Sequence, residues 1–290
     1  VDRIFLESPG CSQSFDTSYI NFKAIAESRL FHFGYPPLLR QFYLHKGSQL
    51  VEMFREVKRL GVITSMDFSL PDKESESGKI DWLEIMKRAL PFTDIFTPSL
   101  EEALQIVIPS KYDEIQSAAS NNEEVIDLIP MATIREVGKC IIDAGTKIVL
   151  IKAGHRGVYL QTGDIRSINE DYGFNLPQEQ WNFRELWCQA YSVDPSRIKN
   201  ASGAGDVAIA AFISSILDGE SPELSLRYAA MAGRDKLYCS NIYNDLPDGQ
   251  KVWDEIRSET NELVDLKGLK NNNGVDLNNS ARKRKRLKTS

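Results

Sequence analysis

The sequence predicts an α/β fold in which a mostly parallel sheet lies between two layers of helices. Two observations lead to this prediction. Short strand-like runs such as Val62–Asp67 and Lys147–Gly154 alternate along the chain with segments whose apolar residues recur at helical spacing. In the clearest run, Lys147–Gly154, the apolar residues are consecutive, which is typical of a strand buried on both faces of a parallel sheet.

The elements are expected in the following order along the chain. The predicted strands are Arg3–Leu6, Val62–Asp67, Asp94–Thr97, Lys147–Gly154 and, as an outer strand, Gly157–Gly163. The predicted helices are Ser48–Gly61, Asp81–Leu90, one that opens at Ser99, Ile134–Gly145, one that follows Gly203, and Ser221–Leu237. We expect a surface insertion at Lys111–Asn122, and an irregular but packed excursion at the aromatic-rich segment Asp171–Tyr191.

The composition excludes several classes of protein. The 290 residues are 42% hydrophobic and 26% charged, which suits a globular chain with a substantial core. Four cysteines without CxxC spacing favour reduced thiols in the cytoplasm or nucleus, and three scattered histidines give a histidine metal site little to build on. No apolar run approaches the roughly 20 residues that span a bilayer, and no signal-peptide pattern opens the chain. We therefore expect a cytoplasmic protein without membrane contact.

The carboxyl-terminal residues, 256–290, are expected to form a disordered polar tail outside the folded region, 1–255. The segment Arg282–Lys288 reads "RKRKRLK", so the net charge of −6 leaves the rest of the chain more acidic still. An acidic body argues against general nucleic-acid binding. The basic segment is consistent with a nuclear-localisation signal, and equally with a solvated tail.

Chemistry is expected where the strands end, because ligands of parallel α/β folds bind beyond the carboxyl ends of the strands. The stretch "SGAGD", Ser202–Asp206, is the most informative of these positions. Gly203 and Gly205 permit backbone conformations that other residues disfavour, and the first N–H groups of the following helix point outward with a dipole that favours an anion. Asp206 could then accept a proton from a hydroxyl that attacks a phosphorus atom. Alternatively, Asp206 only complements the helix dipole, and the glycines only form a tight turn.

The stretch "NASGAGDVAIAAFISSILDG" resembles the carboxyl-terminal signature of the PfkB, or ribokinase-like, carbohydrate kinases. Five further segments are similar to family motifs and stand in the family order, over most of residues 1 to about 245. They are "RIFLESPGC", "LFHFGYPPLL", "GVITSMDFSLP", "FTDIFTPSLEEA" and "IVLIKAGHRGVYL". The resemblance implies a ribokinase-like three-layer α/β/α fold.

The resemblance also implies roles for individual residues. Asp206 would be the base that deprotonates the acceptor hydroxyl, and Gly203, Ala204 and Gly205 would form the anion hole for the transferred phosphate. Glu102 would organise Mg²⁺ through water. The residues expected to contact the nucleotide, ATP, are Lys152, Gly154, Gly157 and Ser202. Ser202 carries the single hydroxyl that this chain has in place of the two in the family's Asp-Thr-Thr motif.

Several positions depart from the family pattern and leave alternatives open. Ser99 replaces the family's asparagine, and "SLEE" is also a capping box in which Ser99 and Glu102 satisfy each other's backbone amides, so Glu102 has a structural as well as a metal-organising interpretation. Lys152 follows a strand and could be its solvated end. Ser69 and Pro71, Asn200-Ala201, and the Pro9–Ser12 turn also lack side chains that the family carries.

The expected function is ATP-dependent phosphorylation of a hydroxyl on a sugar or a nucleoside-like molecule. Family members begin with a strand, a glycine-pair motif and most of a lid, none of which precedes Val1 here, so we expect an N-terminally incomplete domain unless Val1 is not the natural start. The family also implies a homodimer through that lid. The substitutions at Ser69, Ser99 and Asn200 favour an alternative, a catalytically inactive nucleotide- or sugar-binding protein. A dinucleotide-binding oxidoreductase is disfavoured, because no strand is followed by GxGxxG.

Overall fold

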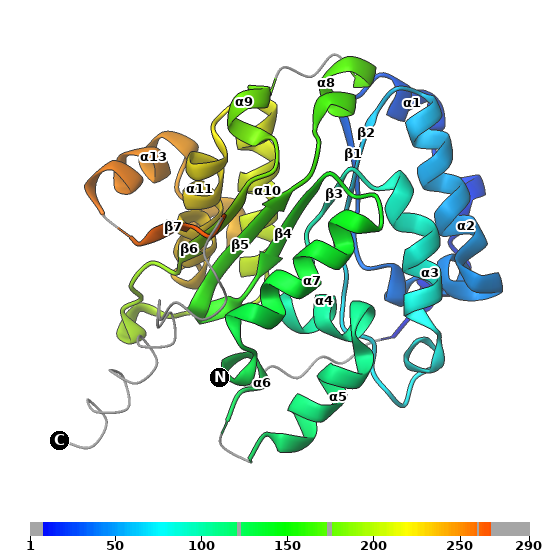
Figure 1. Ribbon diagram of the computed structural model, residues 1–290, viewed down its shortest axis with the longest axis horizontal. Coiled ribbons are helices and arrows are strands. Elements are labelled where there is room, and N and C mark those ends of the chain that lie inside the picture. Colours follow the sequence, from blue (N-terminus) through cyan, green and yellow to red (C-terminus); the bar gives the residue numbers. More distant parts are fainter. Residues whose placement is uncertain (1–7, 121–122, 173–175, 260, 268–290) are drawn as a thin grey trace.

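The computed structural model describes residues 8–120, 123–172, 176–259 and 261–267, and its centre is one seven-stranded sheet. The strands pair in sequence order, each with its predecessor (Figure 1). Their bounds are β1 Leu30–Phe33, β2 Ile63–Met66, β3 Ile95–Phe96, β4 Ile148–Lys152, β5 Gly157–Thr162, β6 Glu185–Gln189 and β7 Leu263–Asp265. The prediction of a central sheet flanked by helices is confirmed.

The sheet is mixed, and its two halves differ in direction. Strands β1 to β4 are parallel, with Ile63 opposite Leu30 and Ile148 opposite Ile95, because a helix returns the chain after each of the first three strands. Strands β4 to β7 pair antiparallel, with Lys152 opposite Val158 where β4 turns into β5. The parallel half therefore directs four carboxyl ends to one edge.

The helices of the described residues vary from one turn to five. Their bounds are α1 Phe22–Ala26, α2 Arg40–Arg59, α3 Trp82–Ala89, α4 Leu100–Val107, α5 Pro109–Ala118, α6 Val125–Leu128, α7 Met131–Asp143, α8 Arg166–Tyr172, α9 Gln178–Trp181, α10 Ala204–Leu217, α11 Pro222–Leu237, α12 Ile242–Asp245 and α13 Gly249–Ser258. None of them has the length and apolar content that a bilayer crossing needs.

Helices cover both faces of the sheet (Figure 1), and a hydrophobic core lies on each face. The first packs α2, α3, α4 and α7 against strand residues such as Met66 and Ile151. The second packs α8 to α11 against the opposite face, through residues such as Leu150 and Phe212. Burial at this scale stabilises the fold by about 1.5–3 kcal/mol for each large aliphatic or aromatic side chain.

Side-chain caps explain where several of the helices begin. The side chains of Asp81, Ser221 and Asp248 accept hydrogen bonds from backbone N–H groups in the first turns of α3, α11 and α13. Helix α2 is interrupted at Leu44–Gly47, where three successive residues have positive φ, so the regular helix that carries Leu50 and Val57 begins near Ser48, as predicted.

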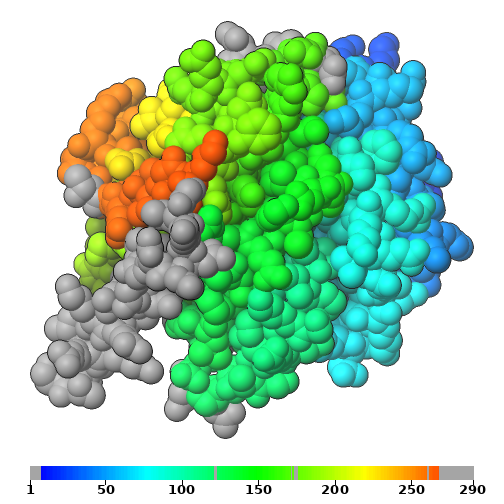
Figure 2. Space-filling model, in the orientation of Figure 1, coloured from blue at the N-terminus to red at the C-terminus, as the bar shows by residue number. Residues whose placement is uncertain are grey.

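The sequence-based expectations failed in two places. The segment Asp171–Tyr191 is not wholly irregular, because Glu185–Gln189 forms β6 and pairs with strands on both sides. The expected boundary at residue 255 falls inside α13, and β7 extends the sheet beyond it, so the folded region continues past that boundary. Figure 2 shows the early elements, in blue, and α13 with β7, in orange, at opposite ends of the molecule. The predicted strand Arg3–Leu6 and the segment Arg282–Lys288 lie outside the described residues.

Candidate active site

Polar side chains from four strand ends and one helix meet at the carboxyl edge of the parallel half. Asp67 directly follows β2, and its Oδ1 accepts a hydrogen bond from Lys152 Nζ, at the end of β4, over 2.7 Å. The Asp67 side chain is 3% exposed and that of Lys152 is 14% exposed. Burial raises the pKa of Asp67, while the Lys152 ammonium opposes that rise. Lys152 is therefore not a solvated strand end but half of a nearly buried ion pair.

The glycine turn brings the amino end of α10 to this ion pair. Gly203 has φ +80°, which side chains disfavour, and no side chain caps the first N–H groups of α10. A Cβ on Gly205 would lie 3.8–3.9 Å from the last three side-chain atoms of Lys152. The uncapped end of α10 thus has a cation beside it, as an anion site requires.

Asp206 lies in the first turn of α10 and is exposed, and its carboxylate accepts a hydrogen bond from the Tyr35 hydroxyl. Tyr35 follows β1 and has φ 58°, a left-handed conformation that is rare for a bulky residue, with the buried Pro36 and Pro37 directly after it. Burial, together with the negative charge of Asp206, raises the pKa of the Tyr35 phenol. The hydroxyl is therefore protonated and donates to Asp206.

Glu102 forms the capping box that the sequence suggested. Its Oε2 accepts a hydrogen bond from the Ser99 N–H over 2.7 Å, and the Glu102 N–H donates to Ser99 Oγ over 3.4 Å. Burial raises the pKa of Glu102 to about 7, and the nearby Lys152 ammonium opposes this. The structural interpretation of Glu102 holds, and it leaves the second carboxylate oxygen available for another partner.

The other predicted nucleotide contacts lie at the same edge, with backbone roles of their own. Gly154 has φ +51° and Gly157 has φ +127° in the turn between β4 and β5. A Cβ on Gly157 would lie 2.1 Å from the Cys188 carbonyl oxygen, so β6 itself requires glycine there. The Ser202 N–H donates to Asn200 Oδ1 over 2.8 Å. Nucleotide binding by these residues stays a prediction.

Two side chains at this edge were missed by the sequence analysis. Tyr35 follows β1, a strand that the family resemblance indicated through "LFHFGYPPLL", but the residues after this strand were not among the strand ends considered. His32, on β1, contacts Ser65 Oγ through Nδ1 at 2.9 Å. Burial and the Lys152 ammonium lower the pKa of His32, so its imidazole is neutral at neutral pH.

Two grooves of the described residues lie away from this edge. One of about 570 Å³ lies at the amino ends of β2 and β3 and is lined by residues such as Arg55, Lys58 and Phe92. Another of about 250 Å³ lies between α10, α11 and α13.

The fold and the position of this edge define a ribokinase-like α/β protein, and comparison with solved structures agrees. A candidate ribokinase II from E. coli, in complex with ATP and Mg²⁺, has a TM-score of 0.57 and 16% identity over 85% of this chain and 64% of that one. Ribokinase from Thermotoga maritima has a TM-score of 0.54 and 16% identity, over 86% and 64%. Ribokinase from Arabidopsis thaliana, complexed with ribose and ATP, has a TM-score of 0.51 and 17% identity, over 80% and 57%.

The chain belongs to the pfkB family of carbohydrate kinases, whose family model matches residues 16–248. It spans less than two thirds of the length of the three solved structures above. Among the curated proteins compared with it, none matches.

Proposed function

We propose that the chain transfers the γ-phosphoryl group of ATP to a hydroxyl of a sugar or nucleoside-like molecule. Its family membership and its fold support this activity. Among its structural neighbours, the E. coli protein is a complex with ATP and Mg²⁺, and the Arabidopsis ribokinase is complexed with ribose and ATP.

The observation that carries the proposal is the hydrogen bond from the Tyr35 hydroxyl to Asp206. A general base must lie within hydrogen-bond reach of the proton that it removes, and here a hydroxyl already occupies that position. An acceptor hydroxyl would replace the Tyr35 hydroxyl on the Asp206 carboxylate. Its oxygen would then bond to the γ-phosphorus as the bond from that phosphorus to the bridging oxygen of ADP breaks, and its proton would pass to Asp206.

The other residues at the edge would bind and orient the phosphates. The N–H groups at the start of α10 have no side-chain cap, because Gly203 stands at the N-cap position. They would donate to the oxygens of the transferred group. Lys152 would hold position beside Gly205 through its ion pair with Asp67 and add positive charge there. These roles assign most of the rate enhancement to positioning and charge stabilisation.

The described residues are compatible with Mg²⁺ that is held mainly by phosphates and water. They contain no group of three or more His, Cys, Asp or Glu side chains that could form a metal cage. Glu102 nevertheless offers a carboxylate oxygen near Asp67 and Lys152, and oxygen is the ligand that Mg²⁺ prefers. Bound Mg²⁺ would neutralise charge on the phosphates, and Glu102 would hold its water ligands when deprotonated.

The test is the substitution Asp206→Asn, which keeps the size of the side chain and its acceptor oxygen for Tyr35. Phosphorylated product is measured over a panel of pentoses, hexoses and nucleosides with ATP and Mg²⁺. We expect the variant to lose about 10²–10⁴-fold in kcat, the usual contribution of a general base. The matched control is Asp218→Asn, which changes the aspartate at the opposite end of α10 and should leave kcat unchanged.

Two results would contradict the proposal. Turnover of Asp206→Asn above about a hundredth of the wild-type rate would rule out the role of the base. Binding of ATP and Mg²⁺ by the wild-type chain without transfer to any acceptor on the panel would rule out the proposed activity.

A further inference from the structure

A lysine is buried beneath the glycine turn, although the family resemblance assigned it no role. Lys236 belongs to the last turn of α11 and is 2% exposed. Its Nζ donates to the Asn200 carbonyl oxygen over 3.3 Å. The same turn is held to α11 a second time, because the Leu237 carbonyl accepts from the Lys199 and Asn200 N–H groups over 2.9 and 3.3 Å.

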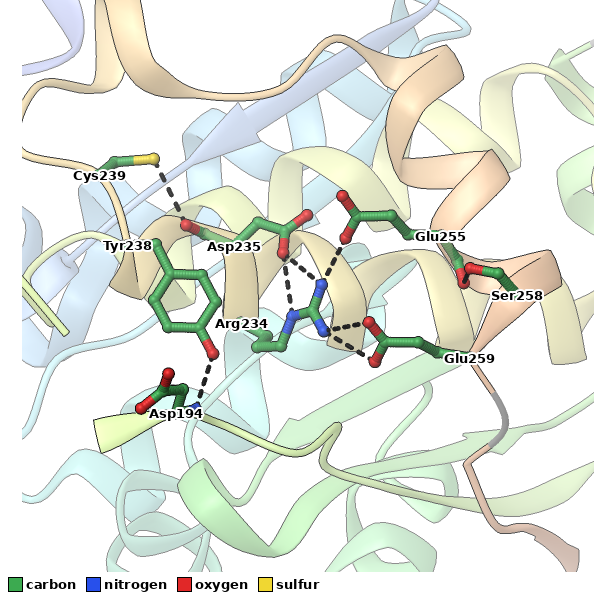
Figure 3. Close-up of polar contacts among 8 residues, drawn as sticks. All are labelled: Asp194, Arg234, Asp235, Tyr238, Cys239, Glu255, Ser258 and Glu259. Atoms are coloured by element: carbon green, nitrogen blue, oxygen red, sulfur yellow. Dashed lines mark hydrogen bonds and ion pairs between the residues drawn. The ribbon is translucent and has the colours of Figure 1, made fainter. Parts of the chain in front are cut away.

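The charge of Lys236 is not neutralised by a carboxylate in the part of the chain that the structure describes. Its neighbour Asp235 is directed to Arg234, with 2.7 Å between Arg234 Nη2 and Asp235 Oδ1 (Figure 3). Arg234 also binds Glu255 and Glu259 of the α13 region, as Figure 3 shows. These three carboxylates therefore surround Arg234, while Lys236 retains one carbonyl partner.

A structural explanation accounts for only part of this arrangement. A cation in the last turn of α11 is favoured by the negative end of the helix dipole. A lysine with that role alone usually extends its ammonium group into water, because burying an unpaired charge is costly. Lys236 instead turns inward beneath the residues that precede α10, so its position needs a further reason.

Lys236 and Asp206 flank the same glycine. A Cβ on Gly203 would lie 3.7 Å from Lys236 Cε and 3.7 Å from Asp206 Oδ2. The ammonium group is thus close to the uncapped amino end of α10, whose dipole is also positive. The Lys236 ammonium group and the positive end of the helix repel each other. The Asp206 carboxylate offsets part of that repulsion, and an anion bound at the turn would relieve the rest.

We propose that Lys236 is a built-in cation of the anion site at the amino end of α10, strengthening the binding of phosphate groups from beneath the turn Asn200–Gly203. Lys236 acts through the turn and through space, as a positioning residue that does not itself touch the phosphate. This inference rests on the proposed function, because both use the same anion site.

The test measures anion binding instead of turnover. Tripolyphosphate and orthophosphate are titrated calorimetrically into the whole chain, into Lys236→Met and into Lys236→Arg. Methionine keeps the length of the side chain without its charge, and arginine keeps the charge. The matched control is Lys199→Met, which removes an exposed charge from the same turn. Lys236→Gln, which can still donate to the Asn200 carbonyl, replaces Lys236→Met if that variant does not fold.

We expect Lys236→Met to bind tripolyphosphate about tenfold more weakly and orthophosphate about threefold more weakly, because the interaction grows with the charge of the ligand. Lys236→Arg should recover most of the loss, and Lys199→Met should stay within about twofold of wild type. Equal weakening of the binding of both anions, or no weakening in a folded variant, would overturn the role of Lys236 and leave the anion site itself in place. A wild-type chain that binds neither anion would overturn the anion site itself, and the proposed function with it.

Discussion

The capping carboxylate of α4 makes the stability of the protein depend on pH, and Glu102→Gln isolates its contribution. Burial raises the pKa of Glu102 from an ordinary value of 4.5 to about 7. Between these values the unfolded chain releases a proton that the folded chain keeps, so the free energy of unfolding falls as the pH rises through this range. The difference corresponds to at most about 3 kcal/mol, and less in practice because part of Glu102 faces solvent.

The assay is urea denaturation of the wild type and of Glu102→Gln at about pH 5 and about pH 8. Glutamine can still accept the hydrogen bond from the Ser99 N–H, so the capping box is retained. We expect the two chains to be similar in stability at the lower pH and the variant to be more stable by about 1–3 kcal/mol at the higher pH.

The control for this prediction is Ser99→Ala, which removes the hydroxyl partner of the capping box but keeps the carboxylate. It should cost about 1 kcal/mol at both pH values and steepen the pH dependence only slightly, because the Ser99 hydroxyl is the weakest of the contacts that hold down the pKa of Glu102. If Glu102→Gln shows the same pH dependence as the wild type, then Glu102 is ionised in the folded state at pH 5 and the reasoning is wrong.

Two further predictions concern the turn and Tyr35. Gly203→Ala should lower the free energy of unfolding by about 1–2 kcal/mol, because φ at this position is +80°. Gly205→Ala should not lower it, because the added methyl group would meet only ordinary contacts. Equal losses of the two variants in calorimetry would contradict this prediction. The Tyr35 phenol should ionise at a lower pH in Asp206→Asn than in the wild type, because the substitution removes a negative charge that raises the pKa of the phenol. Phenolate absorbance measures this ionisation once the signal of the other tyrosines, recorded in Tyr35→Phe, is subtracted. An unchanged titration would argue against the contact between Tyr35 and Asp206.

Local signals predicted most of the parallel half of the fold. The strand Lys147–Gly154 and the helices that open at Ser99 and Ser221 were recognisable from consecutive apolar residues and from capping side chains. Strand β6 was missed because its neighbours are rich in aromatic residues, and its pairing with β5 and β7 depends on contacts that local sequence does not carry. Strand β7 was missed because it is short and lies close to a polar tail.

The candidate site was predictable where it depends on strand ends, and not where it depends on packing between helices. Lys152 and Glu102 were found because each follows a recognisable strand, and the glycine turn was found because it precedes a recognisable helix. The direction of Lys236 could not be predicted. Arg234, Asp235 and Lys236 are consecutive charged residues that point to different sides of the helix, and the sequence does not say which of them faces the interior. The ion pair between Lys152 and Asp67 likewise joins residues of two strands that are not neighbours in the sheet.

The consecutive strand order has a consequence for synthesis on the ribosome. Each strand pairs with the one made just before it, so the sheet can grow from β1 onward as the chain emerges, without waiting for a distant partner. The glycine turn and helices α10 and α11 are translated only after β6. A nascent chain therefore acquires most of its sheet before its anion site. A chain that stopped short of residue 204 would lack the helix that binds phosphate and also the α10 and α11 side chains that cover one face of the sheet.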